Sequence, residues 1–287
     1  MRDNVAMTPF TDRTGRFSTL KTLTLAGLVA PAAYLIYRYW TRDLGPLPVK
    51  EALLVCGLWA VRFLLATLAL TPAQRIFNWP KLALVRRMAG VGAFTYAALH
   101  FTLYIANSKF NLIFVASEIV QRIYLTIGFA TLLGLSLLAA TSTDKAVRTL
   151  GRRWKQLHRA VYAIAALGIV HFFLQSKIDV SEATLMAGLF LTLMIYRLAI
   201  RRRLPFSAPM LAASAVVGGV LTAVSEFAWY GLATGVDPWR IAQANLMLAY
   251  GLRPAVIVML AGLGVAVYPL LRSMFGQVPA ISPSRVA

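Results

Sequence analysis

The chain has 287 residues, of which 59% are hydrophobic and only 14% are charged, and its mean hydropathy is +0.68. A soluble globular domain carries about 25% charged residues, so this composition excludes an ordinary soluble protein. The formal net charge of +19 would suit a nucleic-acid-binding protein. However, the basic residues form short clusters between long apolar runs, which indicates a polytopic membrane protein in contact with lipid, with no nucleic-acid partner.

Eight apolar runs are predicted to cross the membrane as helices. They cover residues 23–40, 52–70, 88–106, 120–140, 157–175, 183–200, 208–231 and 251–271. Pro31 interrupts the first run, but proline is tolerated in membrane helices because neighbouring groups satisfy the freed backbone. The stretches between the runs are too short for a soluble domain, and we expect no cleavable signal peptide before the first run. The sequence therefore predicts an all-α, polytopic transmembrane helix bundle.

The basic residues are distributed unevenly between the two sides of this bundle. If the N-terminus is cytoplasmic, the inner segments hold 19 lysines and arginines and the outer segments hold 8. Because positively charged loops stay in the cytoplasm, this bias predicts that both termini are cytoplasmic. The basic clusters at residues 86–87, 151–155 and 201–203 are then explained as topology anchors that are attracted to anionic lipid.

The three histidines of the chain, His100, His158 and His171, lie in or at the edge of the apolar runs. An imidazole inside a membrane is costly and needs a partner, and a neutral histidine nitrogen is a favoured axial ligand of haem iron. His100 follows Arg87 by 13 residues and His171 follows Lys155 by 16, so both are expected in the outer half of the bilayer. They can therefore pair across one haem. The alternative for each histidine is an interhelical hydrogen bond.

His158 is predicted near the inner surface, where no other histidine lies opposite it. Arg86 and Arg87 occupy that depth and are candidates for binding haem propionates or a flavin phosphate, although lipid anchoring also explains them. His158 and His171 share the predicted helix 157–175, and in a straight helix they would point about 140° apart. Either they face different neighbours, or the helix winds irregularly between them, with Gly168 as the candidate position.

Other polar residues inside the runs need partners as well. Arg62 lies near the middle of the second run and requires a carboxylate, a propionate or water. Glu118 and Arg122 are four residues apart and are expected to form an ion pair at the start of the fourth run. Glu226 is a candidate for a buried charge in the seventh run. Cys56 is the single cysteine, which excludes an internal disulfide, and we expect it to be a small core residue.

Several segments, taken in order and spacing, resemble one family of bacterial membrane proteins. They are RFLLATL at 62–68, Thr71-Pro72, Arg86-Arg87, Leu99-His100, GRRWKQLH at 151–158, Val161-Tyr162 and His171-Phe172. The family is MsrQ, formerly YedZ, the haem-binding membrane subunit of the bacterial protein-methionine-sulfoxide reductase system. It belongs to the ferric-reductase-like transmembrane group together with NADPH oxidases. The resemblance extends from about residue 20 to about residue 203.

The resemblance implies b-type haem, one or two per chain, with His100, His158 and His171 as its ligands, and an association with FMN. It also implies a location in the bacterial inner membrane and a periplasmic, molybdopterin-dependent methionine-sulfoxide reductase as partner. Typical members have six spans. We therefore expect a cytoplasmic N-terminal segment (1–22), a six-helix ferric-reductase-like haem domain (23–203) and a C-terminal extension with two further spans (204–287).

The expected function is electron transfer without substrate chemistry, so no catalytic residue is predicted. The sequence contains no glycine-rich dinucleotide fingerprint, and electrons would therefore arrive from a cytoplasmic flavin reductase or from membrane quinol. One alternative is a cytochrome b that acts as a ferric or quinone reductase with another acceptor. A second alternative is a transporter or scaffold whose histidines only form hydrogen bonds.

Overall fold

A computed structural model describes residues 10–11, 15–177, 179–247 and 251–274, and these residues are helical apart from turns, loops and one isolated bridge between Thr11 and Phe17. Parts of the predicted N-terminal segment (1–9 and 12–14) and of the C-terminal extension (248–250 and 275–287) lie outside the described residues. The all-α fold class is confirmed.

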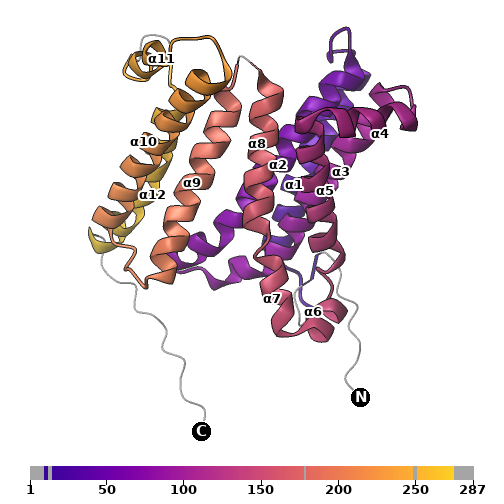
Figure 1. Cartoon of the computed structure of the whole chain (residues 1–287). Helices are drawn as coiled ribbons and strands as arrows, with labels where there is room; N and C mark the ends of the chain where they lie inside the picture. Colours follow the sequence, from indigo (N-terminus) through magenta and orange to yellow (C-terminus); the bar gives the residue numbers. More distant parts are fainter. Residues whose placement is uncertain (1–9, 12–14, 178, 248–250, 275–287) are drawn as a thin grey trace, which may run out of the picture. The chain divides into compact units, whose positions relative to one another are not determined.

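Eight helical segments within the described residues are long and apolar enough to cross a membrane, which confirms the predicted number. They are α1 (Thr19–Trp40), α2 (Pro48–Ile76), the 3₁₀ turn η1 (Pro80–Val85) continued by α3 (Arg86–Asn107), α5 (Ile123–Ala140), α7 (Arg152–His158) followed by α8 (Val161–Ser176), α9 (Ser181–Arg201), α10 (Ala208–Ala233) and α12 (Pro254–Met274) (Figure 1).

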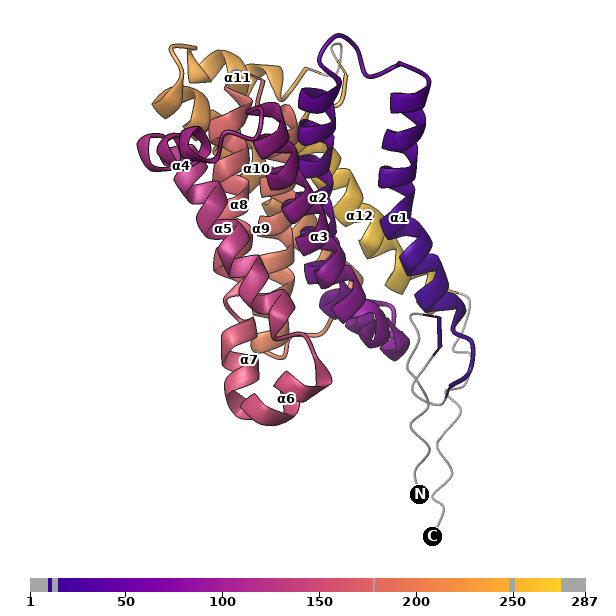
Figure 2. The ribbon, with the colours of Figure 1, turned by 90° about the vertical axis from the view of Figure 1, so that its right-hand side faces the viewer.

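Three shorter helices lie in segments that were expected to be loops or span ends. They are α4 (Leu112–Gln121), α6 (Asp144–Leu150) and α11 (Pro238–Ala244). Each begins at a side-chain cap, because Asn111, Thr143 and Asp237 accept hydrogen bonds from backbone N–H groups of the first turn. Figure 2 shows α4 across one end of α5 and the pair α6–α7 beyond the other end. The short helices therefore sit at the ends of the spanning helices.

The structure differs from the sequence prediction in the helix that carries His158 and His171. The helix is interrupted at Arg159 and Ala160, whose N–H groups bond the carbonyls three residues earlier, which is the tighter 3₁₀ pattern. Gly168, the predicted position of irregular winding, lies inside the regular helix α8 and is buried. The angle expected for one straight helix therefore does not apply to these two histidines.

The chain divides into two compact units. The first comprises residues 1–74 and 79–186, and the second comprises residues 75–78 and 187–287, so α9 runs from the first unit into the second. In the first unit α5 packs against α3, α4 and α8, and α1 packs against α3. In the second unit α10 packs along α12, as Figure 1 shows.

Pro31 is accommodated in the first unit by a tyrosine from α3. The Tyr96 hydroxyl donates a hydrogen bond of 2.8 Å to the Leu28 carbonyl and accepts one of 3.0 Å from the Ala32 N–H. These two backbone groups would pair with each other in a regular helix, so the hydroxyl is inserted into the α1 hydrogen-bond ladder. The first predicted span is therefore continuous despite its proline, because α3 satisfies the backbone beside it.

Small residues set the close packing of the second unit. A Cβ at Gly262 of α12 would lie 2.6 Å from Ala215 Cβ of α10, and one at Gly219 would lie 2.9 Å from Met259 Cβ. Backbones approach this closely only where side chains are absent, which is the usual packing of helices in lipid.

Candidate functional site

The structure brings together two of the three histidines. His100 of α3 and His171 of α8 have ring centroids 6.3 Å apart, with their planes at 81°. Both belong to the first unit, and both are half-buried. The expectation that they meet, which came from their distances to the basic residues at the inner boundary, agrees with this arrangement.

Each of the two imidazoles is held through Nδ1 by a backbone carbonyl of a neighbouring helix. His100 Nδ1 donates to the Leu53 carbonyl of α2 at 2.8 Å, and His171 Nδ1 donates to the Tyr124 carbonyl of α5 at 2.7 Å. Because a carbonyl oxygen only accepts, Nδ1 carries the proton in both rings and Nε2 keeps its lone pair. Histidines that bind metals are oriented in this way by a second hydrogen bond.

The spacing of the two rings suits two ligands of one metal ion. A histidine nitrogen lies roughly 2 Å from a metal that it binds and roughly 1 Å from the centre of its own ring, so two axial histidines have centroids roughly 6 Å apart. The observed 6.3 Å agrees with this value. Two imidazoles at this spacing, each with Nε2 free, are a donor set that suits haem iron, whereas among the described residues no group of three or more His, Cys, Asp or Glu could form a multi-ligand metal site.

His158 lies apart from this pair, at the end of α7. Its Nε2 is 3.1 Å from the Thr141 hydroxyl, and its ring stacks on Trp154 with centroids 4.0 Å apart. The Trp154 indole N–H donates to the Thr141 carbonyl at 2.8 Å. His158 is thus positioned by the residue that ends α5, and it meets neither of the other histidines.

The two arginines of the predicted inner site have different partners. Arg86 donates from Nη2 to Gln74 Oε1 at 2.6 Å, and Arg87 forms a 2.7 Å ion pair with Asp144 of α6. Asp144 follows Thr141, the partner of His158, by three residues, so Arg87 and His158 lie on the same side of the first unit. The buried Nε of Arg86 has no hydrogen-bond partner within the described part of the chain.

Arg62 and Glu226, the other two charged residues predicted to need partners inside the spans, each pair with an opposite charge. Of the three partners expected for Arg62, the structure shows a carboxylate, since its Nη2 is 3.2 Å from Glu182 Oε2. The guanidinium also lies 5.1 Å from the ring centre of Trp59, a cation–π distance. In the second unit Glu226 is only 1% exposed and pairs with Arg253 at 2.6 Å, so it is a buried charge as expected.

The predicted ion pair of Glu118 and Arg122 is present at 2.6 Å, and it lies where α4 ends and the fourth span, α5, begins, as expected. Arg122 also donates to the Tyr124 hydroxyl at 3.0 Å. Hydrogen bonds to Tyr124 and Glu118 raise the pKa of Arg122 above its ordinary value. Glu118 balances the charge of Arg122 at this junction, which is connected to the His171 site because the Tyr124 carbonyl accepts the bond from that histidine.

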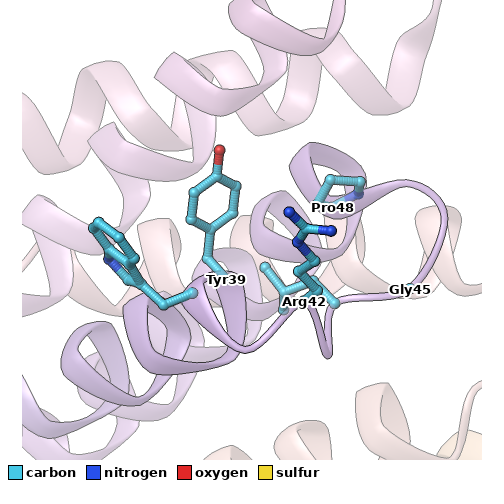
Figure 3. A pocket seen from close by; sticks show the side chains of 6 residues that line it. Tyr39, Arg42, Gly45 and Pro48 are labelled. Atoms are coloured by element: carbon cyan, nitrogen blue, oxygen red, sulfur yellow. The ribbon is translucent and has the colours of Figure 1, made fainter.

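A separate cavity lies in the loop that joins α1 and α2. Its volume is about 430 Å³, and it is lined by Tyr39, Trp40, Arg42, Leu44, Gly45 and Pro48. Figure 3 shows the side chains of Tyr39, from the last turn of α1, and of Arg42, from the loop, extending to the same side of the backbone. No histidine lines the cavity, so it is separate from the histidine pair. Aromatic residues beside an arginine are typical of the boundary between lipid and water.

Sequence reasoning missed the groups that orient the histidines. The Leu53 and Tyr124 carbonyls are backbone atoms, which leave no signal in residue type. A weak signal exists in spacing, since Gly57 precedes His100 by 43 residues and Gly128 precedes His171 by the same number.

Comparisons with known proteins agree with the predicted family. The family described as Ferric reductase like transmembrane component matches residues 56–169. The protein-methionine-sulfoxide reductase heme-binding subunit MsrQ of Rhodospirillum rubrum is 40% identical over 202 residues, which cover 69% of this chain and 95% of that relative. MsrQ of Xanthomonas euvesicatoria pv. vesicatoria is 39% identical over 186 residues, or 62% of this chain and 84% of the relative. No solved structure matches the chain significantly. Because the chain covers nearly the whole of a relative to which it is 40% identical, it belongs to the MsrQ family.

Proposed function

We propose that this chain is the membrane electron-transfer subunit of a methionine-sulfoxide reductase system, and that His100 and His171 hold haem b between α3 and α8. The observation that carries the proposal is the geometry of this pair. The ring centroids are 6.3 Å apart, and each Nδ1 is bonded to a carbonyl so that Nε2 keeps its lone pair. The names of the relatives, which are heme-binding subunits, point to the same cofactor.

Four helices would hold the haem, because α3 and α8 provide the histidines and α2 and α5 provide the carbonyls that orient them. The carbonyls of Leu53 and Tyr124 fix the tautomer of each histidine and make its free nitrogen a stronger ligand. Haem with two histidine ligands has no open coordination position, so it supplies one-electron transfer and no oxygen activation. The helices around the pair exclude water and satisfy their own backbone groups, which a site within lipid requires.

Electrons are proposed to enter from a cytoplasmic flavin reductase or from quinol and to leave to a periplasmic, molybdopterin-dependent methionine-sulfoxide reductase. Support for the acceptor comes from the relatives, which are named as subunits of a protein-methionine-sulfoxide reductase. Support for an inner-membrane location with both termini in the cytoplasm comes from the excess of basic residues in the inner segments, 19 against 8. A separate donor is needed because the sequence lacks a dinucleotide fingerprint.

The inner residues are proposed as a second binding region. His158 would ligate a second haem or replace a ligand of the first, in addition to its contacts with Thr141 and Trp154. Arg86 and Arg87 would bind haem propionates or the phosphate of FMN. Arg86 is the better candidate of the two, because Asp144 already neutralises Arg87 while the buried Nε of Arg86 has no partner within the described residues.

The test is to purify the full chain and to record a reduced-minus-oxidised spectrum, followed by reduction of methionine sulfoxide with the secreted enzyme present. A b-type spectrum together with electron delivery to that enzyme is the expected result. A colourless protein would refute the haem site and favour a transporter or scaffold. Haem without delivery to that enzyme would favour the second candidate, a ferric or quinone reductase with another acceptor, which the match to ferric reductase-like proteins supports.

A further inference from the structure

The two histidine sites are built by the same local arrangement, once from α2 and α3 and once from α5 and α8. In each, the histidine bonds a carbonyl 47 residues earlier in the chain, Leu53 for His100 and Tyr124 for His171. In each, a glycine stands four residues after the residue whose carbonyl accepts this bond, at position 57 or 128. The repeat suggests that the glycines have the same purpose in both sites.

The two glycines lie directly against the imidazoles. A Cβ at Gly57 would be 2.8 Å from His100 Nδ1 and 3.0 Å from Cε1. A Cβ at Gly128 would be 2.6 Å from His171 Cε1 and 2.7 Å from Nδ1. Carbon atoms do not approach ring atoms this closely, so any side chain at these positions would displace the ring.

The helix geometry explains why the glycine stands four residues after the carbonyl. In an α-helix the carbonyl of residue i accepts the N–H of residue i+4, so the side chain at i+4 lies beside that carbonyl. A carbonyl oxygen has a second lone pair that can accept another bond. Where residue i+4 is glycine, this lone pair stays open, and an imidazole from the next helix can reach it.

We infer that Gly57 and Gly128 are positioning residues for His100 and His171. Because each glycine lacks a side chain, the helix carbonyl four residues earlier stays free to accept the hydrogen bond from Nδ1 of the histidine. This inference rests on the proposed function. The hydrogen bond from Nδ1 to the carbonyl fixes the ring in the orientation and tautomer that leave Nε2 available to haem. Replacement by alanine forces the ring off its carbonyl, and the loss of such an outer partner typically weakens metal binding about 10- to 100-fold.

Two other glycines at the same helix interfaces provide matched controls. A Cβ at Gly134 of α5 would be 2.8 Å from both Cδ1 and Cγ1 of Ile164 in α8, so it would crowd an aliphatic side chain as closely as the test variants crowd an imidazole. A Cβ at Gly90 of α3 would make only an ordinary 3.5 Å contact with Thr67 Cγ2 of α2. Gly134→Ala and Gly90→Ala therefore add the same methyl group to the same interfaces without touching a histidine.

The first experiment compares Gly57→Ala and Gly128→Ala with these controls in the purified full-length protein. We expect haem retention at limiting haem to fall about tenfold or more in the two test variants and to stay near wild type in the controls. The low-spin ferric EPR signal, which depends on the angle between the axial ring planes, should change only in the test variants. Wild-type haem binding with an unchanged EPR signal and midpoint potential in both test variants would overturn the inference.

A second experiment needs no haem and remains informative if a test variant inserts poorly. Gly128→Ala is placed in the wild type and in a His171→Ala background, and the melting temperature in detergent is compared. If the glycine acts through the ring, its replacement lowers the melting temperature in the wild type and has little effect once the ring is absent. An equal fall in melting temperature in both backgrounds would show that the glycine acts through general helix packing. That result would refute its role in positioning the histidine. A colourless wild type would refute the proposed function while leaving this result valid.

Discussion

The imidazole of His158 stacks on the indole of Trp154, one turn earlier in α7, with ring centroids 4.0 Å apart and planes at 26°. Both side chains also contact Thr141 at the end of α5, His158 through the hydroxyl and Trp154 through the carbonyl. These contacts connect α7 to α5 on the side of the first unit that carries Arg87. His158 therefore has a packing role, and its proposed part in cofactor binding has to be separated from it.

Replacement of His158 by alanine is expected to leave haem at His100 and His171, because the variant touches neither ring nor the Leu53 and Tyr124 carbonyls that hold them. The haem-to-protein ratio and the midpoint potentials of the purified variant provide the measurement. Half the wild-type ratio would assign a second haem to His158. An unchanged ratio with unchanged potentials would leave only the packing role, and complete loss of haem would contradict the separation of the two sites.

His100→Ala and His171→Ala are each expected to remove nearly all haem from the paired site, since each leaves the iron with one protein ligand. Reduced-minus-oxidised spectra, normalised to protein, measure the loss. Thr102→Ala is a suitable control, because this exposed residue lies two positions after His100 and bonds only the Ala98 carbonyl of its own helix. Wild-type haem content in either histidine variant would rule out the pair.

Gly262→Ala is expected to destabilise the second unit, because the new methyl group would overlap Ala215 at 2.6 Å from its Cβ and 3.0 Å from its backbone Cα. Overpacking of this kind typically costs about 1–3 kcal/mol. Gly264→Ala is the control on the same helix, since nothing lies within 4 Å of its added Cβ. Unfolding in detergent should separate the two variants, and equal stability would argue against close packing of α10 and α12.

Hydropathy and charge predicted the fold because the membrane allows few solutions. An apolar run of this length must be a helix that satisfies its own backbone, so all eight spans were found from sequence. The proximity of His100 and His171 was also predicted, from their distances to the basic residues at the expected inner boundary, and the two rings do lie close together. The same reasoning identified Glu226 as a buried charge in the second unit, whereas its partner Arg253 was found only in the structure.

The features that the sequence did not predict are those that do not depend on the type of residue at a single position. The break at Arg159 and Ala160 contains neither glycine nor proline, so the pattern continues through it as one apolar helix. The short helix α4 was placed partly in a loop, because its ten residues are too few to register as a span. The carbonyls of Leu53 and Tyr124 could not be predicted, since which carbonyl a histidine reaches depends on helix packing.

The C-terminal extension provides the last prediction, that a chain ending after Leu204 still binds haem at His100 and His171. Both histidines and their carbonyl partners lie in the first unit, and no histidine follows residue 203. The truncation would, however, uncover α9, where Thr192 packs against Gly218 and Gly188 packs against Thr222 of α10. We therefore expect a coloured but less stable protein, measured as haem per protein and as melting temperature.

Electron delivery by the truncated chain has to be measured separately with the periplasmic acceptor, because docking can fail while haem remains. Gly262→Ala in the full chain is the companion variant, since it loosens the second unit without removing it. If the truncated chain inserts normally but contains no haem, the second unit contributes to the cofactor site, because the partners of both histidines in the first unit would then be insufficient to hold it.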